Sequence, residues 1–219
     1  MRDPLGRTTG VFVLITRIKR WIWFSLASRL STVRTARHIW IGALAPDRSS
    51  ESSLLDKVEA ALDLIAAHDP HRLNRLSRDL KYIWVTSFPW GNGHYHAGFD
   101  VCHLHDQFVR NPNVSPARLA STIVHEATHA RIHHHGIQYK ASLRQRIEHA
   151  CAKSQLAFAT RLPDGASEVE RLSAILQAPP RDRSDERFRR AIQAARIQWL
   201  VTMGAPGWLL RLLSRRRAA

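Results

Sequence analysis

The chain contains little cysteine, and this shortage narrows what the protein can be. Its two cysteines, Cys102 and Cys151, are too few for a disulfide framework and suit a reducing compartment. No CxxC pair occurs, which excludes a structural zinc site built from four cysteines. A glycine-rich phosphate-binding loop and internal repeats are also missing. Chemistry must therefore be sought among other side chains.

Long uncharged runs are missing as well. The uncharged stretches 8–16, 21–28 and 39–46 are much shorter than the roughly 20 residues of a membrane-spanning helix. A fourth stretch, 197–210, is also too short and is broken by glycine and proline. Arg17, Lys19 and Arg20 interrupt what would be the apolar region of a signal peptide. We expect a cytoplasmic protein, with peripheral association at the inner membrane face left open.

Acidic residues are scarce relative to basic ones. The 33 Lys and Arg residues outnumber the 18 Asp and Glu residues, for a net charge of +15 at pH 7. This balance favours anionic partners such as nucleic acid, an anionic membrane surface or an acidic protein. In residues 1–45, basic side chains alternate with aromatic ones such as Trp21 and Trp23. This segment either lies on an anionic surface or packs on the domain through its aromatic face.

An H-E-x-x-H pentad, His125–His129, lies in a stretch that the sequence predicts to be helical. Ser115 suits the N-cap and Pro116 the first helical position. An apolar stripe follows at helical spacing: Leu119, Ile123, Ala127 and Ala130. His125 and His129 then share one face and can bind a zinc ion. Glu126 points near the same place, where it can accept a proton from metal-bound water.

A catalytic zinc site needs a third protein ligand, and four residues after the pentad are candidates: His133, His134, His135 and Glu148. If the helix continues to Gly136, His133 lies about 12 Å along the axis from His125, which is too far for one ion. His135 has the spacing of the metzincin pattern, but Ile132 occupies the position of the glycine that turns the chain back. On an unbroken helix His135 faces away from His129.

Glu148 is the preferred third ligand. A second helix is predicted from Lys140 to about Arg161, after a break that begins at Gly136. If the two helices pair as an antiparallel hairpin, Glu148 comes level with His129. The alternative is a surface pair between Glu148 and Arg144, one helical turn apart.

The pentad followed by Glu148 resembles the zinc-binding core of the gluzincin branch of the zincin metallopeptidases. This resemblance implies that His125, His129 and Glu148 hold Zn²⁺ and that Glu126 is the general base. Many gluzincins carry an aspartate where Ala152 stands here, so another group must orient a histidine ligand: Asp100, Asp106 or a backbone carbonyl. A weaker resemblance to small DNA-associated zincins would use His135 as the third ligand, with Tyr139 as the following aromatic.

The remaining pattern predicts an α+β fold, a mostly helical minimal zincin-like domain with a small antiparallel sheet before the motif helix. Strands are expected over residues 81–88, 94–99 and 101–104. The predicted units are a basic aromatic segment (1–45), a zincin-like catalytic core (46–163) and C-terminal helices with a basic tail (164–219). By the resemblance, residues 93–104 would contact an extended substrate. Histidines in this segment also allow a second metal site: His94, His96, His103 and His105.

These observations predict a zinc-dependent hydrolase and, more specifically, a metallopeptidase that acts on a peptide or protein. Tyr139, or His94 or His96, is the candidate donor to the oxyanion. The alternative is a basic adaptor associated with a membrane or with nucleic acid, in which zinc is structural or absent. The two hypotheses differ in the number of protein ligands, because a catalytic ion keeps one open position.

Overall fold

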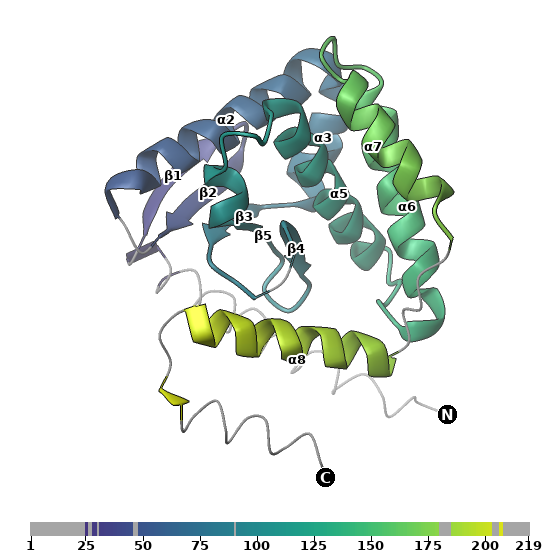
Figure 1. Ribbon diagram of the computed structural model, residues 1–219. Helices are drawn as coiled ribbons and strands as arrows, with labels where there is room; N and C mark the ends of the chain where they lie inside the picture. The colour runs from purple at the N-terminus through teal and green to yellow at the C-terminus, as the bar shows by residue number, and fades with distance from the viewer. Residues whose placement is uncertain are drawn as a thin grey trace, which may run out of the picture.

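The computed structural model describes residues 25, 28–29, 31–45, 48–89, 91–179, 185–202 and 206–207. Within these residues the strands form one mixed sheet in the order β1-β2-β3-β5-β4 (Figure 1). Their bounds are β1 Thr32–Ala36, β2 Ile39–Leu44, β3 Tyr82–Thr86, β4 Gly93–His96 and β5 Val101–His105. β2, β3 and β5 are parallel, whereas β1 and β4 pair antiparallel to their neighbours at the two edges.

Several of the helices form successive layers on one side of this sheet. Their bounds are η1 Arg48–Ser50, α2 Glu51–His68, α3 Pro70–Asp79, α4 Asp106–Arg110, α5 Pro116–His134, α6 Ala141–Ala159, α7 Ala166–Gln177 and α8 Asp185–Thr202. α2 and α5 contact the strands, α6 packs on α5, and α7 packs on α6 (Figure 1). The motif helix α5 therefore lies between the sheet and the α6–α7 pair.

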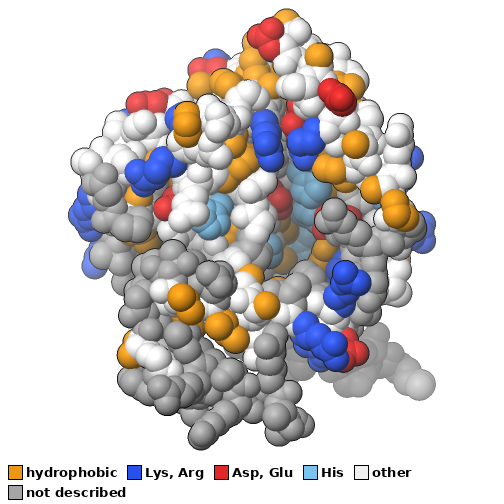
Figure 2. All heavy atoms as spheres, in the orientation of Figure 1, with side chains coloured by type: hydrophobic (Ala, Val, Ile, Leu, Met, Phe, Trp, Pro, Cys, Tyr) orange, Lys and Arg blue, Asp and Glu red, His pale blue; other side chains and the backbone are white. Residues whose placement is uncertain are grey.

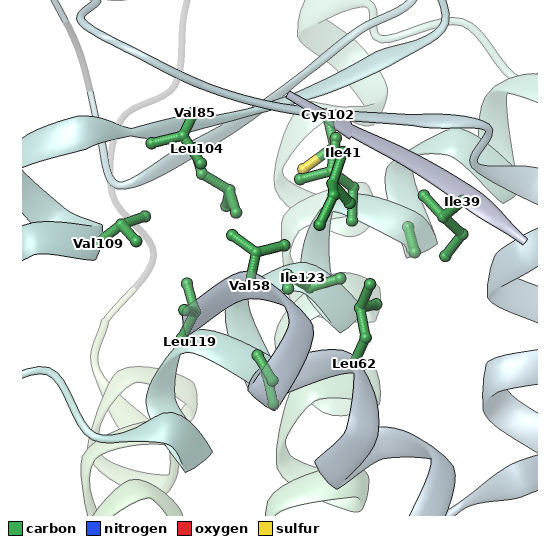
Figure 3. Close-up of a cluster of buried hydrophobic side chains, with 14 of the residues drawn as sticks. Ile39, Ile41, Val58, Leu62, Val85, Cys102, Leu104, Val109, Leu119 and Ile123 are labelled. Atoms are coloured by element: carbon green, nitrogen blue, oxygen red, sulfur yellow. The ribbon is translucent and has the colours of Figure 1, made fainter. Parts of the chain in front are cut away.

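The hydrophobic core lies between the sheet and the first helical layer. Because side chains alternate across a strand, every second residue points to the helices. Ile39 and Ile41 of β2 and Leu104 of β5 are fully buried in this way. They meet apolar residues of α2 and α5, including Val58 and Ile123 (Figure 3). This packing fixes α5 against the sheet.

The ends of α5 follow from local chemistry. The Ser115 hydroxyl accepts a hydrogen bond from the backbone N–H of Arg118 at 3.2 Å, and Pro116 occupies the first turn. After the helix, Gly136 adopts φ +79°, a left-handed conformation that costs glycine little. The predicted capping and break of the motif helix are therefore confirmed.

The α+β prediction is confirmed, but two details of the predicted fold are wrong. The sheet is mixed rather than antiparallel, because α2 and α3 form a crossover that brings β3 alongside β2 in parallel. Residue 46 is not a boundary of the folded core, since Ile39 and Ile41 are buried within it. Leu172 of α7, beyond the predicted boundary at residue 163, is buried as well.

The predictions about the two terminal segments fall mostly outside the described residues. Most of the basic aromatic segment before residue 31 and most of the basic tail after residue 202 lie outside the described residues. Among the helices that are described, none is both long enough and apolar enough to cross a membrane.

Candidate metal centre

Two packed helices bring the predicted ligands together. His125 and His129 project from α5, and Glu148 projects from the middle of α6. Glu148 Oε1 lies 3.5 Å from His129 Nε2, and Glu148 Oε2 lies 3.7 Å from His125 Nε2. Donors bound tetrahedrally at about 2.0–2.2 Å from zinc lie about 3.3–3.6 Å apart. The two distances to Glu148 are close to this range, so the three residues are candidate ligands of one ion.

A buried glutamine orients the first of these histidines. His125 Nδ1 lies 3.1 Å from Gln155 Oε1. Gln155 lies two turns after Glu148 in α6. The Gln155 amide nitrogen donates to Ser121 Oγ at 3.1 Å and to Glu168 Oε1 at 3.3 Å. These two bonds fix the orientation of the amide, so that Gln155 Oε1 accepts a hydrogen bond from His125 Nδ1–H. The lone pair of His125 Nε2 then remains available to bind a metal.

The sequence did not identify this orienting group. The predicted acceptors Asp100 and Asp106 lie beside other histidines, His134 and His105. Asp100 accepts from the Tyr95 hydroxyl at 2.7 Å and lies 3.0 Å from His134 Nε2. Asp106 lies 3.2 Å from His105 Nδ1. The one sequence signal for Gln155 is its position seven residues after Glu148, which places both side chains on the same face of α6.

Glu126 lies between the edge strand and the paired histidines. Its Oε2 accepts a hydrogen bond of 2.8 Å from the backbone N–H of Tyr95 in β4. Burial, reinforced by the nearby charge of Glu148, raises the pKa of Glu126 to about 8. Gly93 leaves room for this carboxylate, because a Cβ at that position would lie 3.0 Å from Glu126 Oε1. The arrangement presents a buried carboxylate of raised proton affinity beside the candidate ligands.

Tyr139 lies at the site, with its hydroxyl directed to Glu148. The hydroxyl donates to Glu148 Oε1 at 2.5 Å, and the ring lies 5.6 Å from the His129 ring, centroid to centroid. The Arg144 guanidinium lies 5.3 Å from the centre of the Tyr139 ring. In this arrangement Tyr139 positions the Glu148 carboxylate, while the predicted role as an oxyanion donor stays a prediction.

Cys151 is a potential fourth donor, although the sequence analysis considered it only as one of two cysteines too few for a disulfide framework. His125, His129 and Cys151 each have one potential donor atom, and these three atoms lie within 4.8 Å of one another. Cys151 is fully buried, and burial raises the pKa of its thiol. Its position three residues after Glu148, on the same face of α6, is the signal that could have indicated it.

The other histidines lie apart from this site. His135 ends α5 and lines a separate cavity of about 450 Å³ with Arg72 and Arg131. His94 and His103 are cross-strand neighbours on β4 and β5, and burial lowers their pKa to about 4 and about 3. Among the described residues, His125, His129 and Cys151 are the one group of three donors close enough to hold a metal, so the second metal site predicted at the strand histidines is not supported.

Two of the candidate ligands, His125 and Glu148, line a cleft of about 1000 Å³ between α5, α6 and α7. Gly93 of β4 and Glu126 line it near the histidines, and Leu172 and Ile175 line the α7 side. Figure 2 shows this hollow, with histidine and acidic side chains inside it and basic side chains at its rim. The site is therefore accessible from outside rather than sealed in the core.

Comparisons with protein-family models, curated proteins and solved structures find no match to this chain.

Proposed function

We propose that this protein is a zinc-dependent hydrolase and, more specifically, a metallopeptidase. The observation that carries the proposal is the closeness of Glu148 to both His125 and His129, at the edge of an open cleft that His125 and Glu148 line. Glu126 lines the same cleft as a carboxylate of raised pKa. Two histidines and a glutamate with an adjacent general base are a donor set suited to metal-assisted hydrolysis.

Each residue has a defined task in this proposal. His125, His129 and Glu148 hold the ion, with Gln155 fixing the tautomer of His125 and Tyr139 holding the Glu148 carboxylate. Zinc, when bound, would polarise the scissile carbonyl and lower the pKa of water. Glu126 accepts the proton of the attacking water and passes it to the leaving amine.

The position of β4 favours a peptide substrate. β4 is the outermost strand on its side of the sheet, and Gly93 in this strand lines the cleft. An extended peptide could add to this edge by main-chain hydrogen bonds, which would place its carbonyl groups along the cleft. Tyr95 N–H, which holds Glu126, belongs to the same strand, so substrate and base would be aligned by one element.

The test is metal analysis and peptide hydrolysis by the purified protein and three variants. Glu148→Ala should lose most of the bound zinc, whereas His135→Ala should retain it because His135 lies in a different cavity. Glu126→Gln should keep the metal and lose activity by at least about 100-fold, as expected for removal of a general base. Undiminished hydrolysis by Glu126→Gln would refute the mechanism.

One observation favours a second candidate, the adaptor with a structural ion. If the Cys151 sulfur binds together with Glu148, the ion has four protein donors, as in structural zinc sites. X-ray absorption of the zinc protein separates the two cases, because a zinc–sulfur bond of about 2.3 Å is longer than bonds to nitrogen or oxygen. Cys151→Ser is the control that must abolish a sulfur signal. A spectrum with a sulfur donor and four protein ligands would favour the adaptor.

A further inference from the structure

Three arginines from three different helices line the cleft that contains the candidate metal ligands. Arg118 comes from the first turn of α5, Arg146 from α6 and Arg171 from α7. Arg118 is half-buried and its guanidinium lies 5.8 Å from the centre of the Phe108 ring. Arg146 is exposed on the adjoining wall. Positively charged side chains from three helices therefore line the same cleft.

These arginines differ in whether an acid within the protein already neutralises them. Arg171 is paired with the buried Glu168, at 2.5 Å and 2.8 Å, and that pair supports Gln155. Arg118 and Arg146 make no ion pair in the described part of the chain. Two guanidinium groups are therefore available to a ligand that enters the cleft.

The acids that line the cleft do not cancel this charge in the metal-bound protein. Glu126 and Glu148 are the acidic lining residues, and the proposed function uses both at the ion. A divalent cation offsets two carboxylates, which leaves the charge of Arg118 and Arg146 uncompensated. A cleft lined by charge of one sign concentrates ligands of the opposite sign.

We propose that the cleft selects acidic peptides, with Arg118 and Arg146 binding Asp or Glu side chains that flank the scissile bond. The inference rests on the proposed metallopeptidase function and names its substrate class. Guanidinium groups recognise carboxylates by paired N–H donors, which gives both affinity and orientation. A peptide is favoured over other polyanions because edge strand β4 lies at the same cleft and can pair with an extended main chain.

The test uses zinc-loaded Glu126→Gln protein, so that binding is measured without cleavage. Two matched fluorescent peptide pools are compared, with neutral residues at all positions except one, which is Glu in one pool and Gln in the other. Fluorescence anisotropy should show the Glu pool binding about 3- to 10-fold more tightly at low salt, the size expected for partly exposed ion pairs. Equal affinity for the two pools would overturn the proposal.

Four further variants, made in the Glu126→Gln background, test the assignment to particular residues. Arg118→Gln and Arg146→Gln should each reduce the preference, and Arg146→Glu should reduce it further or reverse it. Arg78→Gln removes an exposed arginine of α3 that does not line the cleft, and it should leave the preference unchanged. A preference that survives all cleft variants, or one that Arg78→Gln removes equally, would show that general surface charge is responsible and would overturn the proposal.

Competition and turnover separate the remaining outcomes. If single-stranded DNA or anionic lipid vesicles displace the Glu pool and bind through Arg118 and Arg146 more tightly than it does, the proposed ligand class is wrong. If the wild-type protein cleaves both pools with equal kcat/KM, the selectivity proposal fails while the proposed function stands. If it cleaves neither pool but keeps the binding preference, the proposed function fails and charge selection by the cleft stands.

Discussion

Glu126 should make the metal-free protein less stable as the pH rises. Its carboxyl is buried, and its pKa of about 8 in the folded state exceeds the ordinary value of 4.5. A carboxyl with a raised pKa binds its proton more tightly in the folded state than in the unfolded chain. It therefore contributes stability below the unfolded pKa, and this contribution is lost as the pH rises toward the folded pKa.

The size of the effect follows from the two pKa values. Each factor of ten in proton affinity corresponds to 1.36 kcal/mol, so the penalty for Glu126 grows by about 2 kcal/mol between about pH 6.5 and about pH 9. Buried His94 and His103 have lowered pKa values, so they reduce stability as the pH falls through the ordinary value of 6.5 and below it. Wild type and Glu126→Gln share both histidines, so the difference between the two proteins isolates the contribution of Glu126.

The assay is urea unfolding of chelator-treated protein at the two pH values. Wild type should lose about 2 kcal/mol more than Glu126→Gln over the interval, because glutamine stays neutral and can still accept from Tyr95 N–H. Glu170→Gln, at an exposed position of α7, serves as the control and should behave like wild type. Parallel pH profiles for wild type and Glu126→Gln would show that burial of Glu126 is not the source, and the reasoning would be wrong.

Three further substitutions test other contacts of the fold and the site. Gln155→Leu removes the partner of His125 Nδ1 and should weaken zinc binding about 10- to 100-fold in a competition titration with a chelator; unchanged affinity would argue against its orienting role. Gly93→Ala introduces a Cβ 3.0 Å from Glu126 Oε1 and should lower kcat/KM without loss of bound zinc. Gly42→Ala places a Cβ 2.6 Å from the buried Trp84 ring and should destabilise the protein by about 1–3 kcal/mol in urea unfolding, whereas an unshifted midpoint would contradict this packing.

Much of the candidate site could be predicted from residues that are close together in the sequence. The turn of a helix places His125 and His129 on one face, and Ser115 and Gly136 define where that helix begins and ends. Because the helix breaks at Gly136, an antiparallel hairpin was the simplest arrangement of the two helices. That arrangement predicted that Glu148 lies close to His125 and His129. These inferences succeeded because helical period, capping and short connections are governed by local sterics and hydrogen bonding.

Other features depend on which distant segments pack together. Gln155 and Cys151 are on the correct face of α6, but their distance from the histidines depends on how closely α6 packs against α5. The parallel pairing of β2 with β3 depends on the crossover through α2 and α3. The alternation of side chains along a strand does not indicate in which direction its neighbour runs.

The sequence by itself determined the motif helix, its caps, the excess of positive charge and the donor types available to a metal. Only the tertiary structure decided that Glu148 rather than His135 faces the paired histidines, and that Arg118 and Arg146 line the same cleft. The physical reason is that local backbone preferences act over a few residues. Which side chains line the cleft depends instead on how three helices pack together, and the cleft-lining residues of these helices lie tens of positions apart in the sequence.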